Sequence, residues 1–196
     1  MENEMLEFRI HGRGGQGIVV AAAIFAEAVF MEGYYARAFS LFGAERRGAP
    51  VTAFIRAGKN RLMPRSRVYH PDYVAIFDST MTGSSLVSGL KKSGTLLLNS
   101  KGDCENSIIK DIPRNMDIKT FSVDATDIAW KHNLAIGSFP MVNTVMLGAM
   151  AHNSGMASLD SLVESIRKRV SARLEENIAA VKEGYESVKE VGSFVN

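Results

Sequence analysis

Cysteine is almost absent from this chain, whose 196 residues include only Cys104. A disulfide needs two cysteines, and a cysteine-based zinc site or an iron–sulfur cluster needs several. None of these three can therefore be built within this chain. The four histidines, His11, His70, His132 and His152, are scattered, and neither a His-x-x-His pair nor a carboxylate pair has metal-ligand spacing. The sequence therefore predicts no metal and no cofactor bound tightly by this chain alone.

Signatures of catalysis and of targeting are missing as well. The chain contains neither a P-loop nor a nucleophile elbow, so no catalytic residue is assigned. Its start carries Glu2, Glu4 and Glu7 instead of a basic region followed by an apolar core. No apolar run is long enough to cross a bilayer. We expect a cytoplasmic protein without a membrane partner.

The overall composition is that of an ordinary globular protein, with 46% hydrophobic and 22% charged residues. This length suits a single domain over residues 1–196. A net charge of +2 gives no reason to expect nucleic-acid binding. A local basic cluster is interpreted as a solvated hairpin; it consists of Arg56, Lys59, Arg61, Arg65 and Arg67.

Glycine is concentrated in one segment near the N-terminus, the glycine loop of residues 12–17. It lies between an apolar run typical of a strand, residues 6–10, and an alanine-rich run typical of a helix, residues 18–31. A strand, a tight turn and a helix N-terminus can form an anion site from backbone N–H groups. The candidate binding residues in this loop are Gly12, Arg13, Gly14, Gly15, Gln16 and Gly17.

The glycine spacing fits G-x-G-x-x-G, which alone is a weak sign of a dinucleotide site. A nicotinamide site would place Asp or Glu about 20 residues later, at the end of the second strand. The second predicted strand, residues 34–39, ends before Ser40 and contains Arg37, so an NAD site is disfavoured. A phosphate-rich ligand remains open, and so does a loop whose glycines only allow close packing.

A second unusual segment, residues 42–50, places three charges between glycines. Its candidate binding residues are Glu45, Arg46, Arg47 and Gly48. Adjacent arginines can pair with phosphates or carboxylates through forked hydrogen bonds. The alternatives are a surface turn with a local ion pair and a loop that closes over a ligand or a partner chain.

Strands and helices alternate along the chain. Strands are predicted at residues 6–10, 34–39, 51–56, 61–64, 73–77, 95–98 and 120–123, and helices at 18–31, 84–91, 126–131, 143–151, 159–173 and 175–191, the last interrupted at Gly184. This order predicts an α/β fold: a Rossmann-like, mainly parallel sheet with helices on both faces and an inserted β-hairpin at residues 51–64. Ligands of such sheets lie beyond the carboxyl ends of the strands. His11, Ser40, Asp78, Asn99 and Asp124 follow predicted strands at those ends.

The longest motifs identify a family resemblance. Residues 12–17 (GRGGQG) and 39–54 (FSLFGAERRGAPVTAF) closely resemble the gamma subunit of 2-oxoacid:ferredoxin oxidoreductases. Residues 74–78, 99–100, 143–149 and 177–185 agree with it, so the resemblance covers nearly the whole chain. The form Arg46-Arg47-Gly48-Ala49-Pro50 is similar to the pyruvate/2-oxoisovalerate branch, whereas relatives acting on 2-oxoglutarate or indolepyruvate more often have Arg-Gly-Gly there.

The resemblance implies a role in a larger enzyme. These enzymes decarboxylate a 2-oxoacid oxidatively with thiamine diphosphate, coenzyme A and iron–sulfur clusters, and they reduce ferredoxin. Alpha and beta subunits hold the thiamine diphosphate, and the delta subunit carries the clusters. The gamma chain resembles the domain of single-chain enzymes that packs beside the thiamine site and helps to form the coenzyme A region. An isolated gamma chain would be inactive, and its exposed interface would allow a homodimer.

Residues and resemblance together suggest that the glycine loop and Glu45, Arg46 and Arg47 face a shared site, where an arginine meets a phosphate of coenzyme A. The same loops could instead form only a subunit interface. Two readings of other classes also remain: a free-standing nucleotide-binding dehydrogenase and a non-catalytic scaffold. The resemblance favours pyruvate as the 2-oxoacid, with 2-oxoisovalerate and 2-oxoglutarate as the alternatives.

Overall fold

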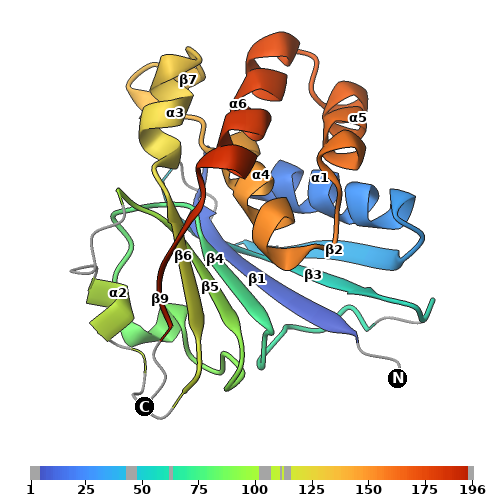
Figure 1. Ribbon diagram of the computed structural model, residues 1–196, viewed down its shortest axis with the longest axis vertical. Helices are drawn as coiled ribbons and strands as arrows, with labels where there is room; N and C mark the ends of the chain where they lie inside the picture. The colour runs from blue at the N-terminus through green and yellow to red at the C-terminus, as the bar shows by residue number, and fades with distance from the viewer. Residues whose placement is uncertain are drawn as a thin grey trace.

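A seven-stranded sheet is the centre of the computed structural model, which describes residues 5–42, 48–61, 64–101, 107–110, 112 and 116–193 (Figure 1). The strand order is β2-β3-β1-β4-β5-β6-β9. These strands are β1 (Leu6–Arg13), β2 (Tyr35–Phe42), β3 (Pro50–Gly58), β4 (Tyr73–Ile76), β5 (Thr95–Asn99), β6 (Lys119–Val123) and β9 (Lys189–Ser193). The helices are α1 (Ile18–Met31), α2 (Ser107–Lys110), α3 (Ala125–Lys131), α4 (Asn143–Ser154), α5 (Leu159–Arg169) and α6 (Leu174–Ser187), with a 3₁₀ helix η1 (Ser84–Leu86).

The direction of the strands confirms the predicted α/β class. β1, β4, β5 and β6 pair in parallel, while β3 runs antiparallel to both β1 and β2, and β9 antiparallel to β6. Within the described part of the chain, all strands of the large sheet except β3 and β9 therefore point the same way. Their carboxyl ends meet at one edge, where ligands of such sheets bind.

Both faces of the sheet are covered, which explains why β4 and β5 read as continuous apolar runs. Ala75 and Leu97 point into the larger core, beneath α1, α4, α5 and α6. Val74, Ile76 and Leu98 belong to a second core on the opposite face, together with Leu86 of η1 and Ile108 of α2. In Figure 1, α2 lies on the side of the sheet away from α4 and α6.

The hairpin predicted at residues 51–64 is partly wrong. β3 is a strand, but it lies inside the sheet, and its hairpin partner is β2. Arg61 and Pro64 are not in a strand, and residues 62–63 lie outside the described part. The small inserted hairpin of this fold is elsewhere, at β7 (Ala135–Ile136) and β8 (Phe139–Pro140), a pair that the sequence reading missed.

A buried arginine, Arg56, explains why the strand predicted at residues 61–64 does not form. Arg56 on β3 is 3% exposed and pairs with Glu7 at 2.7 Å, so the basic cluster is not wholly solvated as interpreted. Its guanidinium also donates to the carbonyls of Pro64 and Ser66, at 2.8 and 2.6 Å. These carbonyls are therefore bound by a side chain instead of a strand partner. Lys59, Arg61, Arg65 and Arg67 are exposed, as expected.

The helix predicted at residues 84–91 is reduced to the single turn of η1. Arg9 on β1 reaches across the sheet face and donates to the carbonyls of Leu86 and Ser88, at 3.0 and 2.7 Å. Gly89 has φ +75°, and a Cβ there would lie 2.1 Å from the Tyr69 carbonyl oxygen. Tertiary contacts to the backbone thus replace helical hydrogen bonds.

The C-terminal helices differ from their predictions at the ends. The helix predicted at residues 159–173 ends at Arg169, because Val170 is extended and Arg173 has φ +51°. α6 continues through Gly184 without the predicted interruption and ends at Ser187. The residues predicted to prolong it form β9 instead, at the edge of the sheet.

Candidate functional site

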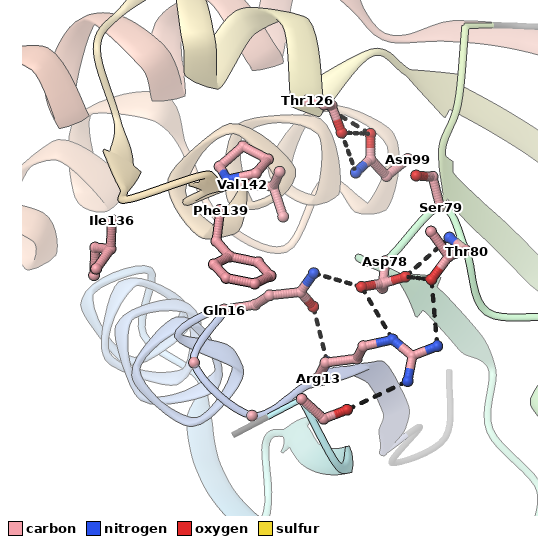
Figure 2. A pocket seen from close by; sticks show the side chains of 14 residues that line it. Arg13, Gln16, Asp78, Ser79, Thr80, Asn99, Thr126, Ile136, Phe139 and Val142 are labelled. Atoms are coloured by element: carbon pink, nitrogen blue, oxygen red, sulfur yellow. Dashed lines mark hydrogen bonds and ion pairs between the residues drawn. The ribbon is translucent and has the colours of Figure 1, made fainter. Parts of the chain in front are cut away.

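A recess of about 490 Å³ opens at the carboxyl edge of the sheet, between the glycine loop and the β7–β8 hairpin (Figure 2). Small-molecule sites span about 300–1,000 Å³, so this volume suits a ligand. The described residues that line the recess are Arg13, Gly14, Gly15, Gln16, Gly48, Asp78, Ser79, Thr80, Asn99, Thr126, Ile136, Phe139, Pro140 and Val142.

The glycine loop is tied to the segment that precedes β3. Gly14 donates its N–H to the Ala49 carbonyl at 2.8 Å, and Gly48 donates to the Gly14 carbonyl at 3.0 Å. The loop also closes on itself. The Arg13 N–H donates to Gln16 Oε1 at 2.8 Å, and the Gln16 N–H donates to the Arg13 carbonyl at 3.1 Å. Three of the N–H groups expected to cradle an anion therefore already have protein partners.

Two of the predicted binding glycines shape the loop instead of lining the recess. A Cβ at Gly12 would lie 2.4 Å from Ile18 Cδ1. Gly17 precedes α1 with φ +72°, and a Cβ there would lie 2.6 Å from Asn143 Nδ2. These contacts place Gly12 and Gly17 against neighbouring side chains, while Gly14 and Gly15 face the recess.

Asp78 organises the floor of the recess (Figure 2). Its carboxylate accepts from Gln16 Nε2 at 2.6 Å and from the Thr80 N–H at 2.9 Å, and the Thr80 hydroxyl donates to it as well. Burial alone would raise the pKa of this carboxyl. The hydrogen bonds from Thr80 and Gln16 and the charge of Arg13 outweigh burial and lower its pKa, so Asp78 is ionised at neutral pH.

The Arg13 side chain contacts three other residues that line the recess, Asp78, Gly48 and Thr80. Its guanidinium lies 3.4 Å from Asp78 and donates to the Gly48 carbonyl and to Thr80 Oγ1, each at 3.3 Å. Its side chain is 37% exposed, so a ligand can still reach it. Arg13 and Asp78 carry opposite charges, so the described residues that line the recess have no net charge together.

Asn99 and Thr126 form the far side of the floor. The Asn99 amide donates to the Phe77 carbonyl at 2.8 Å and to Thr126 Oγ1 at 3.1 Å, joining the ends of β4 and β5 to the start of α3. The expectation that strands deliver polar residues to one edge is confirmed for Asp78 and Asn99. Ser40 is an exception, because it lies within β2 and does not line the recess.

The apolar wall was missed by sequence reasoning. Ile136 and Phe139 are 51% and 64% exposed and come from the β7–β8 hairpin. The available signal was the dipeptide Gly137-Ser138 between two short apolar pairs, which is typical of a tight hairpin. Its strands have only two residues each, too short for a periodicity to be read.

Other predicted features lie away from the recess or outside the described residues. Glu45, Arg46, Arg47 and Cys104 lie outside the part of the chain that the structure describes. His11 is buried on β1, beside Thr52 Oγ1 at 3.5 Å, and does not line the recess. Desolvation, followed by the charges of Arg9 and Arg67, lowers the pKa of His11 to about 3, against a small opposing effect of the Leu86 carbonyl.

The described residues show neither a metal-ligand cluster nor a membrane-spanning helix. Groups of three or more His, Cys, Asp or Glu side chains arranged for a metal ion are not found there. None of the helices in the described part of the chain is long and apolar enough to span a membrane.

The sheet order and its covered faces place the chain among the α/β proteins of Rossmann-like architecture. A family model for pyruvate ferredoxin/flavodoxin oxidoreductase matches residues 7–187, and the chain belongs to this family.

Similar proteins extend over the full length of the chain. The pyruvate synthase subunit PorC of Methanothermobacter thermautotrophicus is 42% identical, with 95% of this chain and 98% of that protein covered. The pyruvate/ketoisovalerate oxidoreductases common subunit gamma of Pyrococcus furiosus is 41% identical, with 94% and 98% covered. The crystal structure of the pyruvate oxidoreductase subunit PORC of Thermotoga maritima has a TM-score of 0.80 at 36% identity, with 95% and 98% covered.

Proposed function

We propose that this chain is the gamma subunit of a multi-subunit pyruvate:ferredoxin oxidoreductase. The observation that carries the proposal is similarity along the whole chain to proteins named as pyruvate synthase and pyruvate oxidoreductase subunits. The complex would oxidise pyruvate to carbon dioxide and acetyl-coenzyme A and pass the electrons to ferredoxin. Because the Pyrococcus relative is named as common to two enzymes, 2-oxoisovalerate is the second candidate substrate.

The other subunits would supply the redox cofactors. The alpha and beta chains would hold the thiamine diphosphate, which would supply the chemistry for decarboxylation, and the delta chain would carry the iron–sulfur clusters. The single cysteine of this chain accords with that division of labour. The proposed partners are therefore alpha, beta and delta subunits, with ferredoxin as acceptor of the whole complex, in the cytoplasm.

The recess is the proposed contribution of this chain to the coenzyme A site. Arg13, Gly14, Gly15, Gln16 and Gly48 form its first wall, and Asp78 holds the Arg13 and Gln16 side chains in place. Gly12 and Gly17 support the loop from behind. Glu45, Arg46 and Arg47 come directly before Gly48 in the chain, and we propose that they take part in binding at the same site.

The exposed apolar hairpin supports a site that a partner chain completes. Ile136 and Phe139 place large apolar side chains at the rim of a recess whose opposite wall is polar. Exposed apolar surface next to a cavity is typical of protein contacts and of ligand grooves. The competing proposal within the same family is that this edge serves only as a subunit interface.

Reconstitution of the complex with an Arg13→Gln subunit tests the proposal. We expect the KM for coenzyme A to rise about tenfold, as for loss of one charge-assisted contact, while the KM for pyruvate stays unchanged. Arg169→Gln is the matched control, because Arg169 pairs with Glu27 on the α5–α1 surface, away from the recess. Unchanged coenzyme A kinetics together with weaker subunit assembly would favour the interface alternative.

A further inference from the structure

The strand β2 forms one edge of the large sheet, and its outer side has no strand partner among the described residues. The sheet order ends at β2, which pairs with β3 from Tyr35 to Phe42 in an unbroken antiparallel register. An edge strand presents a row of unpaired backbone N–H and C=O groups to which another strand can bind. β2 therefore offers a template eight residues long.

The opposite edge of the sheet shows how such a template can be blocked. The strand there, β9, has only five residues, and two of them are the charged Lys189 and Glu190. Its register with β6 shifts between Thr120 and Phe121. Short length, charged side chains and an irregular register each protect an edge from pairing. β2 is longer, its register is regular and its one charged residue is Arg37, so it carries little of this protection.

The two faces of β2 differ in exposure. Ala36 and Ala38 pack against the larger core, on the face that α1 covers (Figure 1). Side chains alternate along a strand, so Tyr35, Phe39 and Leu41 lie on the other face, where Tyr35 and Leu41 are 42% and 46% exposed. Five of the nine exposed large apolar side chains in the described part of the chain belong to α1 and β2. Such a concentration is typical of a protein contact.

Symmetry restricts how β2 can pair with a second copy of itself. Two copies of one strand pair antiparallel about a two-fold axis perpendicular to the sheet, and this axis passes through one residue because opposite residues share a face. An axis at Arg37 would place like charges opposite each other, which is destabilising. An axis at Phe39 would set Leu41 opposite Arg37 and leave Tyr35 beyond the end of the other β2. An axis at Ala38 pairs all the residues from Tyr35 to Leu41.

We propose that a second copy of this chain pairs with β2, antiparallel and centred on Ala38, so that the sheets of the two copies join. In this register Tyr35 lies opposite Leu41 of the second copy, and Arg37 lies opposite its Phe39. The first pair buries the exposed apolar side chains of both copies, and the second places a guanidinium beside an aromatic ring. This pairing does not depend on the proposed function; within that complex it would join two gamma subunits.

Sedimentation velocity of the full-length chain at several concentrations tests the pairing. We expect a reversible dimer whose dissociation constant rises at least about tenfold with Leu41→Lys, because two apolar contacts are lost and two charges are added at the edge. Ile136→Lys is the matched control, since Ile136 is a similarly exposed aliphatic residue, at 51%, on the β7–β8 hairpin. It should leave the dimer unchanged. Circular dichroism checks that both variants fold.

Thiol cross-linking tests the register. Tyr35→Cys and Leu41→Cys are made separately in a chain with Cys104→Ser, which removes the single native thiol. When the two variants are mixed, their thiols lie on opposite residues, with Cβ atoms about 4.5–5.5 Å apart, and a short bis-maleimide should join them. In either variant alone the thiols lie six positions apart along the strands, roughly 20 Å, and should not be joined.

A chain that stays monomeric at every concentration would overturn the pairing, and so would a dimer that Ile136→Lys weakens as much as Leu41→Lys. Single variants that cross-link as well as their mixture would overturn the register. A monomeric chain whose Leu41→Lys variant assembles poorly with the alpha, beta and delta subunits would assign the edge to one of those subunits instead. The KM for coenzyme A with Arg13→Gln tests the proposed function separately from all of these outcomes.

Discussion

His11 precedes the glycine loop directly, yet its role is structural. It is 8% exposed on β1, on the sheet face opposite Phe8 and Ile10, and the positive charges of Arg9 and Arg67 act on it. A proton on this imidazole would be buried beside two positive charges, which is why its pKa falls to about 3. His11 is therefore neutral throughout the physiological range and is not available as an acid catalyst.

This depressed pKa predicts a specific loss of stability in acid. Between pH 6.5 and about 3, the imidazole takes a proton in the unfolded chain but not in the folded one. The free energy of unfolding should therefore fall by up to about 1.4 kcal/mol per pH unit through His11 as the pH drops. Urea titrations at pH 6, 5 and 4 should show a flatter pH dependence for His11→Asn than for the wild type.

The control for this experiment is His70→Asn, since His70 is exposed. It should keep the wild-type pH dependence, whatever its effect at neutral pH. Parallel curves for His11→Asn and the wild type would contradict the buried neutral imidazole.

At the level of elements, the backbones of α4 and α6 pack closely against each other. Gly148 on α4 and Gly184 on α6 face each other's backbone: a Cβ at Gly148 would lie 2.0 Å from the Val181 carbonyl oxygen, and one at Gly184 would lie 2.2 Å from that of Val145. Neither glycine has a positive φ, so the requirement is space and not backbone conformation. The family resemblance in residues 143–149 and 177–185 falls on this contact.

Gly148→Ala should therefore destabilise the protein by about 1–3 kcal/mol, because the added methyl group forces the two helices apart. Helix propensity alone predicts the opposite sign, a gain of about 1 kcal/mol from replacing glycine with alanine. Chemical denaturation of the purified chain gives the sign. Lys182→Ala, at an exposed position of α6, is the control and should change stability by no more than about 0.5 kcal/mol. A stabilised Gly148→Ala variant would show that the helices separate at little cost.

At the scale of the whole molecule, we propose that residues 1–196 fold as one domain. The larger core supports this, since it joins residues from Phe8 near the N-terminus to Val181 on α6. The smaller core lies on the opposite face of the same strands, so neither core can form without the sheet. One sheet shared by both cores favours unfolding in a single step.

Urea unfolding should accordingly be cooperative, with the same midpoint by far-ultraviolet circular dichroism and by fluorescence of Trp130. Circular dichroism reports the helices and strands together, whereas Trp130 reports α3 at the carboxyl edge of the sheet. Two separate midpoints would indicate that the α3 region unfolds independently of the sheet.

The sequence was sufficient where local pattern and burial agree. The buried runs of β4 and β5 and the alanine-rich α1 were read correctly, because a short continuous apolar run is typical of a strand covered on both faces, whereas an apolar run of 14 residues is long enough only for a helix. Short elements, and elements that depend on tertiary contacts, were not predicted correctly. The η1 turn depends on hydrogen bonds from Arg9, and β9 forms only by pairing with β6. The strands β7 and β8 are too short to show a periodic pattern.

The candidate site likewise has one part that the sequence predicts and another that only the tertiary structure decides. The sequence by itself determined the glycine loop, because glycines between a strand and a helix carry a local backbone requirement that composition reveals. Only the tertiary structure decided which of those residues face a recess, since that depends on Ile18 and Asn143 packing behind Gly12 and Gly17. It also brought Asp78 and Asn99 to the same recess, because the carboxyl ends of parallel strands meet at one edge however far apart they lie in the chain, and it placed Phe139 of the β7–β8 hairpin beside them.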